Sequence, residues 1–516
     1  MRQEKETNPV LSAIGRISPQ TRAVFLSVLI FGLFSHGTGL LNKLSHQDDI
    51  ANLFGFGATV TSGRWMLHIL CWLENLLFGT GNASLPLFNG MVSFLCVAGV
   101  CALLADLLNI QSRVHCALLS GLMISFPVMT ALFSYMFTSH PYMIGLLMMT
   151  LCAYLICRET PWWVKAAAVL LGAASVGVYQ AYLSILLAVF LMDDIMKLTA
   201  EERIGTVLRR AGIQALCVAG VLLVYFGVNR LFLMKFGVEM TSYQGLDKMG
   251  VMSPGTFLAR VGRAYAMFLS PDRNTGADLY PGTLRILYTV QVALTALLAA
   301  GRVCRVGRRN PGNAVLLAIL FLLLPLGFNF IYVMSEEVHG LMVLGQAMLF
   351  VLLIALLDEQ ESLAFRGGKL LAAAAALVLA VTGVMYARFD NQCYLKETLQ
   401  QQEAMSYYTS VITQIKSQEG YTPEMEICFV NDLTNPDPTI YDLEEMSFIH
   451  LNLYGSSTTD FIHTYKEYFM RRWCGFEANW YWGQDDPETW PEVREMPEYP
   501  ADGSIQIVNG VLIVKF

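Results

Sequence analysis

The sequence predicts a polytopic α-helical membrane protein that ends in a small α/β domain. Of its 516 residues, 55% are hydrophobic and 15% are charged, whereas soluble proteins carry about 25% charged residues. Apolar runs of roughly 18 residues or more recur along the chain, and each predicts a membrane-spanning helix. Residues 388–516 carry 21 Asp and Glu against 8 Lys and Arg. That balance of −13 within a net charge of −7 leaves +6 on residues 1–387, so we expect two regions in different surroundings.

About eleven transmembrane helices are expected. The stretch 164–195 is too long for one straight span and short for two, and Gly177 and Tyr179-Gln180 interrupt it. We interpret it as two short helices that meet at a break, because broken helices at membrane depth are tolerated where they line a cavity. The other nine spans are continuous apolar runs at about 23–41, 86–105, 114–133, 141–157, 211–233, 284–301, 313–333, 340–357 and 370–387.

The distribution of Lys and Arg gives the orientation of these spans. Basic residues gather in the N-terminal segment and in alternate loops, whereas the short loops 134–140 and 334–339 hold none. The pattern is self-consistent only if 164–195 crosses twice, which puts the N-terminus in the cytoplasm and the tail outside. The prediction is therefore a transmembrane domain over 1–387, with outer loops 42–66 and 234–283, and an extracytoplasmic α/β domain over 388–516.

Shorter elements are also predicted. Met66–Gly79 has the character of an interfacial amphipathic helix, and the long outer loop holds a second amphipathic stretch from Thr256 to Leu269. In the tail, 391–417 has helical spacing of its apolar residues, Glu426–Val430 is a strand candidate, and 505–516 is a hairpin around Asn509-Gly510.

One acidic pair stands out in the first outer loop. Asp48 and Asp49 follow the first apolar run directly, and the same loop rejoins the membrane at Gly63-Arg64-Trp65. Ionisable groups close to a bilayer are costly and often mark chemistry or transport. The alternative is an ordinary solvated pair, since Asp193-Asp194 occurs at a predicted cytoplasmic helix end.

The whole pattern resembles the bacterial membrane glucosyltransferases related to O-antigen glucosyltransferase II, which are GT-C-type enzymes with lipid-linked donors. The resemblance runs loosely over the whole chain and is sharpest at His46-Gln47-Asp48-Asp49, at Gly63-Arg64-Trp65, at Tyr179-Gln180 and in the final hairpin. It implies an inverting transfer of a hexose, with glucose as the first candidate, from a polyprenyl-phosphate donor to a surface polysaccharide or glycolipid. The reaction would take place at the outer face of the bacterial cytoplasmic membrane.

The resemblance also implies roles for individual residues. An acidic residue of the first outer loop acts as general base, and by position this is Asp48 or Asp49; the other would bind the acceptor sugar or a metal. The leaving lipid phosphate needs a cation, and Arg64 is the first candidate because a guanidinium matches phosphate in a bidentate way. The alternative for Arg64 is an arginine that snorkels to lipid headgroups. Further candidates for the donor phosphate are Lys248, Arg260 and Arg263.

Acceptor or substrate binding is expected from a third set of residues. For Glu336, Glu337 and His339 in loop 334–339, the alternative to binding is a solvated turn. For Tyr179 and Gln180 at the helix break, the alternative is a buried, hydrogen-bonded contact. The spacing of the acidic residues and histidines fits no metal motif, so the cofactor is undetermined and a divalent metal stays open. The expected acceptor or substrate ligands are His46, Tyr179, Gln180, Glu336, Glu337 and His339.

Two other functions compete with glycosyl transfer. A transporter or flippase of lipid-linked sugars would need charged residues within its spans, and few lie there. A polymerase or ligase of lipid-linked saccharides would also use large outer loops, which by resemblance should be rich in arginine. The expected partners are a polyprenyl-phosphate sugar, a surface polysaccharide or glycolipid acceptor and membrane lipid. Nucleic acid is not expected, because no broad basic patch with interleaved aromatics occurs.

Overall fold

The structure is a computed structural model that describes residues 17–44, 47–79, 83–242, 253–271, 280, 282–359, 368–430 and 461–516. His46 and Lys248, both expected in the site, lie outside these ranges. The chain divides into two units, which are described separately. The helical unit is Met1–Asn42 with Phe54–Asn391, and the sheet unit is Lys43–Leu53 with Gln392–Phe516.

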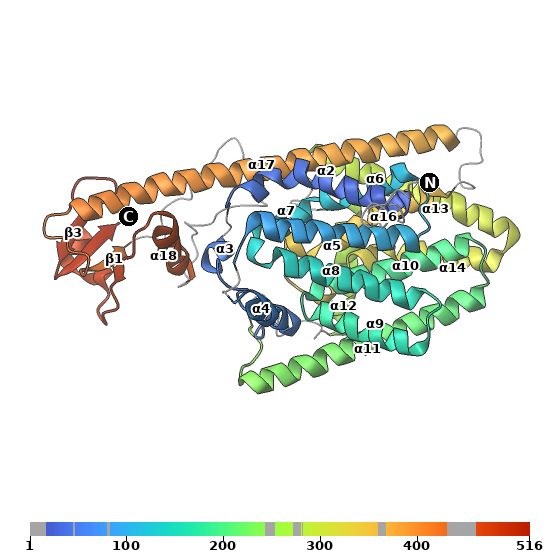
Figure 1. Cartoon of the computed structure of the whole chain (residues 1–516), viewed down its shortest axis with the longest axis horizontal. Coiled ribbons are helices and arrows are strands. Elements are labelled where there is room, and N and C mark those ends of the chain that lie inside the picture. The colour runs from blue at the N-terminus through green and yellow to red at the C-terminus, as the bar shows by residue number, and fades with distance from the viewer. Residues whose placement is uncertain are drawn as a thin grey trace, which may run out of the picture. The chain divides into compact units, whose positions relative to one another are not determined.

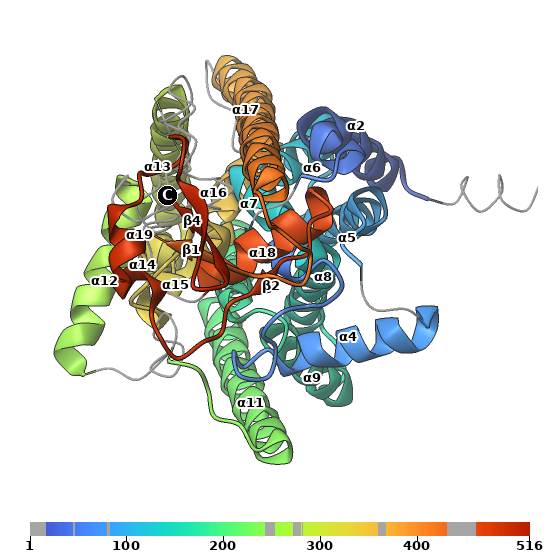
Figure 2. The same cartoon turned by 90° about the vertical axis from the view of Figure 1, so that its left-hand side faces the viewer.

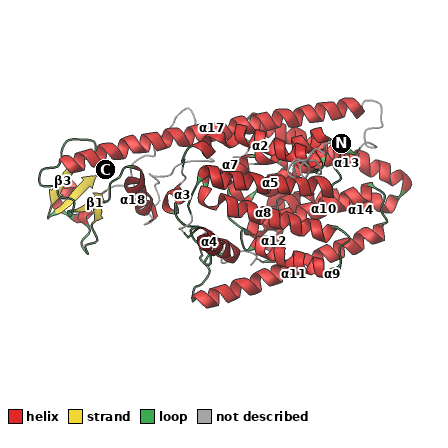
Figure 3. Ribbon diagram, viewed as in Figure 1, coloured by secondary structure: helices red, strands yellow, loops and turns green. Residues whose placement is uncertain are grey.

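The helical unit is a bundle of long helices joined by short, broken ones (Figures 1 and 3). Its helices are α2 (Pro19–Leu41), α4 (Trp65–Phe78), α5 (Pro86–Leu107), α6 (Arg113–Ile124), α7 (Pro127–Ser134), α8 (Met136–Cys157), α9 (Trp162–Val176), η1 (Gln180–Tyr182), α10 (Leu183–Thr199), α11 (Ile204–Phe236), α12 (Pro254–Leu269), α13 (Thr283–Arg309), α14 (Pro311–Phe328), α15 (Ile331–Met334), η4 (Gly340–Met342), η5 (Leu344–Ala347), α16 (Met348–Asp358) and the first part of α17 (Gly368–Ser417).

Length and composition identify the chain as a membrane protein. Seven helices in the described ranges are long and apolar enough to cross a membrane, or eight if the bent pair of α6 and α7 forms one span. The expectation of about eleven spans is therefore not confirmed. Part of the difference lies in 164–195, where α9 and α10 are each shorter than a full span.

Three of the breaks in the described part of the bundle lie next to one another. The predicted break in 164–195 is confirmed, since α9 ends at Val176 and α10 begins at Leu183. η1 in this break contacts η5, and α7 after the α6–α7 bend contacts η4. Close packing here needs glycine: a Cβ on Gly345 would lie 2.1 Å from the Phe328 carbonyl oxygen. Irregular backbone thus gathers where neighbouring segments can satisfy its polar groups.

The predicted amphipathic helix after the first outer loop is present as α4. Figure 2 shows it lying across the long helices and not along them. Its last turns expose Trp72, Leu76, Leu77 and Phe78. Such a helix, with apolar side chains on the outside of a membrane protein, has the form of an interfacial helix.

Three local expectations differ from the structure. His140, expected in a loop, lies in the first turns of α8, because that helix already begins at Met136. The run 340–347 forms the 3₁₀ turns η4 and η5 and only then α16, since Gly345 packs directly on backbone. The helices expected at 370–387 and 391–417 are one continuous helix, α17, because no Gly or Pro separates them.

The sheet unit holds a four-stranded sheet in the order β2-β1-β4-β3. β1 lies parallel to both of its neighbours, and β3 and β4 form the predicted hairpin. Asn509 and Gly510 have φ of 51° and 83°, the left-handed pair that a tight hairpin turn demands. Its elements are α3 (Gln47–Ala51), the last part of α17, β1 (Glu426–Val430), α18 (Phe461–Trp473), β2 (Asn479–Trp480), η9 (Pro487–Thr489), α19 (Pro491–Glu495), β3 (Ile505–Val508) and β4 (Val511–Lys515).

The core of the sheet unit includes one residue from far upstream. Tyr408 and Ile415 of α17, Phe469 of α18 and Leu512 of β4 pack together in it. Ile50 of α3, only 1% exposed, belongs to the same core. The short segment between the first apolar helix and Phe54 is therefore an integral part of the sheet unit.

Candidate active site

Arg64 lies on a pair of stacked tyrosines. Its guanidinium carbon lies 5.6 Å from the ring centre of Tyr179 and 6.0 Å from that of Tyr142. The two rings are 4.9 Å apart and inclined by only 13°. A guanidinium within about 6 Å of an aromatic face is attracted by the ring quadrupole, and Arg is well suited to such stacking. The geometry therefore restrains Arg64 from one side, and we name these three residues the arginine seat.

The break between α9 and α10 builds this seat. The backbone N–H groups of Met66 and Leu67 donate to the Gly177 carbonyl at 2.9 and 3.3 Å, which holds the start of α4 against the break. The indole of Trp65 covers Gly177 so closely that a Cβ there would lie 2.6 Å from Trp65 Cε2. These contacts fix the residue after Arg64 and hence the direction from which Arg64 reaches the tyrosines.

Gln180 holds the loop that carries Arg64. Its Nε2 donates to the Ser62 carbonyl at 2.8 Å and to the Tyr225 hydroxyl at 3.2 Å, and that hydroxyl donates to the Gly63 carbonyl. Gly63 has φ of +70°, and a Cβ would meet the Tyr225 hydroxyl at 2.7 Å. The contacts of Gly63, Arg64 and Trp65 thus give each of the three residues a structural role. A substrate role for Gln180 stays a prediction.

Buried polar atoms near the arginine seat lack a partner among the described residues. They include the Tyr179 hydroxyl and the indole N–H of Trp65. An unpaired buried hydrogen-bonding group is costly, and in native proteins it calls for a specific explanation. The Tyr179 ring lies beside the Arg64 guanidinium, where a ligand with oxygen acceptors would satisfy its hydroxyl.

A second cluster joins α12 to the segment 333–339. Arg260 contacts the Glu336 carboxylate at 3.6 Å and donates to the Val333 and Met334 carbonyls at 3.4 and 3.5 Å. Arg263 donates to the Glu336 carbonyl at 2.6 Å and lies over the Tyr332 ring. The structure therefore brings together three residues that the sequence had only proposed separately.

The rest of this second cluster is more exposed. Glu336 is 84% exposed at its side chain, and Glu337 is exposed as well. His339 is half-buried, and burial lowers its pKa although Glu337 acts in the opposite direction. Its Nε2 has no partner among the described residues. A neutral imidazole is thus favoured there, and its role in binding stays a prediction.

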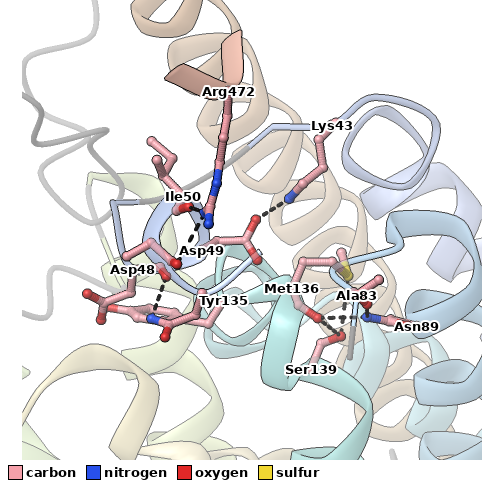
Figure 4. Close-up of polar contacts among 12 residues, drawn as sticks. Lys43, Asp48, Asp49, Ile50, Ala83, Asn89, Tyr135, Met136, Ser139 and Arg472 are labelled. Carbon is pink, nitrogen blue, oxygen red and sulfur yellow. Dashed lines mark hydrogen bonds and ion pairs between the residues drawn. The ribbon is translucent and has the colours of Figure 1, made fainter. Parts of the chain in front are cut away.

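In the sheet unit, Asp48 and Asp49 differ sharply. Asp49 is fully buried and forms an ion pair with Lys43, which Figure 4 shows, whereas Asp48 is half-buried. Successive residues on an α-helix point about 100° apart. On the single turn of α3, therefore, the two carboxylates point in different directions, and only that of Asp49 is fully enclosed.

Two residues that the sequence did not single out also contact this segment. Arg472 of α18 donates to the Ile50 and Ala51 carbonyls, the second at 3.2 Å. Glu397 lies in α17 beyond its apolar part, and burial together with nearby Asp49 raises its pKa to about 8, against the effect of Lys43. No local spacing marks either residue, because they lie about 350 and 420 positions downstream of α3.

Two further residues escaped sequence reasoning in the helical unit. Nothing in the local pattern marks Tyr142, and only its stack with Tyr179 shows its place in the arginine seat. Glu74 pairs with His140 at 3.1 Å, which fastens the middle of α4 to the start of α8. Among the described residues, no three His, Cys, Asp or Glu side chains are placed to hold a metal ion.

Comparison with known proteins gives one family. The sequence model of the family described as "Glucosyl transferase GtrII" matches residues 37–356, which is more than half of the chain. The chain belongs to this family. The predicted resemblance is thereby confirmed, and the protein is a membrane glycosyltransferase. The match includes α3, the arginine seat and the cluster of Arg260, Arg263 and Glu336, and it ends before α17. Comparison with curated proteins and with solved structures gives no match.

Proposed function

We propose that this GtrII-family glycosyltransferase moves a hexose, with glucose as the first candidate, from a polyprenyl-phosphate donor to a hydroxyl of a surface polysaccharide or glycolipid. Membership of a glucosyl transferase family supports the sugar. A bundle of membrane helices supports a lipid-linked donor, because such a donor is confined to the bilayer. On this proposal the enzyme is of the GT-C type, and its chemistry is an inverting single displacement.

The arginine seat is the observation that carries the donor half of this proposal. The guanidinium of Arg64 lies within 6.0 Å of two tyrosine ring centres, which restrains its position, and a guanidinium can bind a phosphate in a bidentate way. The nearby hydroxyl of Tyr179 supplies a further donor. Positive charge held in place before the reaction is most effective where negative charge develops, and here that is the phosphate leaving group.

The difference between the two aspartates supports Asp48 as the general base. Asp49 is fully buried against Lys43, so an acceptor hydroxyl would have to displace an ion pair to reach it. Asp48 is partly exposed on the same turn. A base must come within about 3 Å of the proton it removes, directly or through one water, and the more accessible carboxylate meets that requirement.

The proposed reaction is a displacement at the anomeric carbon. Asp48 takes the proton of the acceptor hydroxyl, and the oxygen of that hydroxyl forms the new glycosidic bond. The bond from the anomeric carbon to the phosphate oxygen breaks, and the phosphate leaves with the electron pair beside Arg64. A single displacement of this kind needs the donor and the acceptor bound at the same time.

The distribution of basic residues supports an outer location for this chemistry. Candidate cytoplasmic loops hold most of the Lys and Arg, and the loops 134–140 and 334–339 hold none. With the N-terminus in the cytoplasm, α3, the start of α4 and the sheet unit all fall on the outer side. The proposed site is thus at the outer face of the bacterial cytoplasmic membrane.

The test is sugar transfer in membranes supplied with a polyprenyl-phosphate glucose and acceptor lipid. Asp48→Asn should lower kcat by about 10²- to 10⁴-fold, the range for a lost general base. Arg64→Gln should lower transfer as well, and Arg64→Lys should not restore it fully, since an ammonium lacks the planar fork. Arg158→Gln is the matched control, because Arg158 also lies over a tyrosine ring but is paired with Asp106 at the far end of α8.

Full transfer activity in Asp48→Asn would refute the assignment of the base. Equal losses in Arg64→Gln and Arg158→Gln would refute the donor half, because they would reflect a general cost of removing an arginine. A donor that must be a soluble nucleotide sugar, inactive as the polyprenyl phosphate, would overturn the lipid-linked mechanism.

A further inference from the structure

α3 is too short to hold itself in place. A helix leaves its first four N–H groups and its last four carbonyl groups without partners inside the helix, and α3 has only five residues. Its last turn is closed by the Asn52 N–H, which donates to the Asp48 carbonyl at 2.9 Å. The orientation of Asp48 must therefore come from the residues packed around this turn.

α18 holds the C-terminal end of α3. Arg472 Nη1 donates to the Ile50 carbonyl (Figure 4) and also to the Ala51 carbonyl. Its guanidinium is itself fixed over the Tyr468 ring, 4.4 Å away. A cation at the C-terminal end of a helix is favoured by the helix dipole, and its N–H groups can satisfy carbonyls that the helix itself leaves without a partner.

α17 holds the other side of the same turn. The Lys43 ammonium pairs with the buried Asp49 carboxylate, and the Lys43 carbonyl accepts a hydrogen bond from Gln401 Nε2 at 3.2 Å. Glu397, fully enclosed, lies beside this ion pair. Between these two anchors Ile50 is buried in the core of the sheet unit. The turn that carries Asp48 is thus held by Lys43 and by Arg472, and both Arg472 and Gln401, which bonds to Lys43, lie beyond the matched family region.

We propose that Arg472 is a positioning residue for glycosyl transfer, which acts through the end of α3 to orient the carboxylate of Asp48. The sheet unit is on this view a required part of the catalytic apparatus, since it supplies both anchors of the turn. The inference rests on the proposed function, in which Asp48 is the base. It adds that residues of the C-terminal region set the rate of the chemical step without touching the substrate.

The test uses full-length enzyme and compares Arg472→Gln with Arg471→Gln. Arg471 is the neighbouring residue of α18, half-exposed, and paired with Glu477 at 3.3 Å on the surface. Arg472→Gln should lower kcat per folded molecule by about 10- to 100-fold, the cost of misplacing a reacting group by roughly 1 Å, with KM for donor and acceptor little changed. Arg472→Lys should recover part of the loss, because its ammonium can still donate to a carbonyl. Arg471→Gln should retain wild-type kcat.

A coupling experiment separates positioning from a merely structural role. In an Asp48→Glu background the carboxylate is already displaced by one methylene, so Arg472→Gln should cost much less than it does in the wild type. An equal fold-loss in both backgrounds, or a wild-type kcat in Arg472→Gln, would overturn the inference. If Asp48→Asn itself keeps full activity, the proposed base is wrong. If Asp48→Asn is inactive while Arg472→Gln is not, only the positioning role fails.

Discussion

Gly177 offers a direct test of the contact that builds the arginine seat. The residue has an ordinary φ of −70°, so alanine there meets no backbone strain and only the added methyl group matters. That methyl carbon would lie 2.6 Å from Trp65 Cε2 and 2.9 Å from both Cζ2 and Nε1. Ordinary contact begins at 3.4 Å, so the indole has to retreat by close to 1 Å.

The cost of this retreat can be estimated. Overpacking a well-filled site typically destabilises a protein by about 1–3 kcal/mol. Because Trp65 directly follows Arg64, and Met66 and Leu67 are bonded to the Gly177 carbonyl, the displacement should pass to the guanidinium. We expect Gly177→Ala to lower the melting temperature in detergent. We also expect it to lower the rate of sugar transfer from the donor by about 10-fold or more, as for a misplaced binding group.

Gly212→Ala is the matched control for this experiment. Gly212 lies inside α11, and nothing stands within 4 Å of the position its Cβ would take. Alanine in that helix interior should be neutral or stabilising by up to ~1 kcal/mol. Wild-type stability together with wild-type transfer in Gly177→Ala would refute the reasoning, because the Trp65 indole could then not be in close contact with Gly177.

Three further predictions concern buried polar contacts. Burial raises the pKa of Glu397 from its ordinary value of 4.5 to about 8. Between these two pH values the folded state holds a proton that the unfolded state has lost. The wild-type stability should therefore fall as the pH rises, by roughly 1.4 kcal/mol per pH unit. Glu397→Gln should remove that slope, and thermal melts at pH 5 and pH 8 that fall in parallel for both proteins would contradict the assignment. His140→Ala breaks the pair with Glu74, so hydrogen exchange of α4 should accelerate, with α9 as an internal reference that should not change. Asp390→Ala should cost about 1–3 kcal/mol by stranding the buried Thr130 hydroxyl, which donates to it at 2.7 Å, whereas Asp390→Asn keeps an acceptor; equal melting temperatures for the two variants would count against this bond.

Local pattern predicted the parts of the fold whose cause is local. The break at Gly177 and Tyr179-Gln180, the strand Glu426–Val430 and the hairpin around Asn509-Gly510 all follow from residue type and spacing within a few positions. The continuity of α17 did not, because a change from apolar to polar residues marks a change of surroundings and not the end of a helix. Hydrophobic periodicity indicates which face of a helix is buried and whether its surroundings are apolar or polar. It gives little information about where a continuous helix ends.

The arginine seat was only partly predictable for a related reason. Gly63-Arg64-Trp65 and Tyr179-Gln180 could each be recognised as unusual in a membrane protein, and the structure brings them together through Ser62 and Tyr225. Tyr142 could not be found in this way, since a tyrosine near a helix start is common and its partner lies 37 positions later. Tertiary packing, and not any local spacing, selects it.

The adjacent aspartates show most clearly what a sequence leaves open. Asp48 and Asp49 are chemically identical neighbours, so no argument from residue type can rank them. What separates them is their surroundings, because Asp49 is fully buried and paired with Lys43 whereas Asp48 is half-buried. Gln401 of α17, which donates to the Lys43 carbonyl, and Arg472 of α18, which donates to the Ile50 carbonyl, lie far along the chain. If the ion pair of Asp49 with Lys43 fixes the turn and thereby presents Asp48 to the acceptor, the two variants should differ. Asp49→Asn should lower the stability of the folded turn, whereas Asp48→Asn should lower the rate of the chemical step. The two aspartates would then have different roles, one structural and one catalytic.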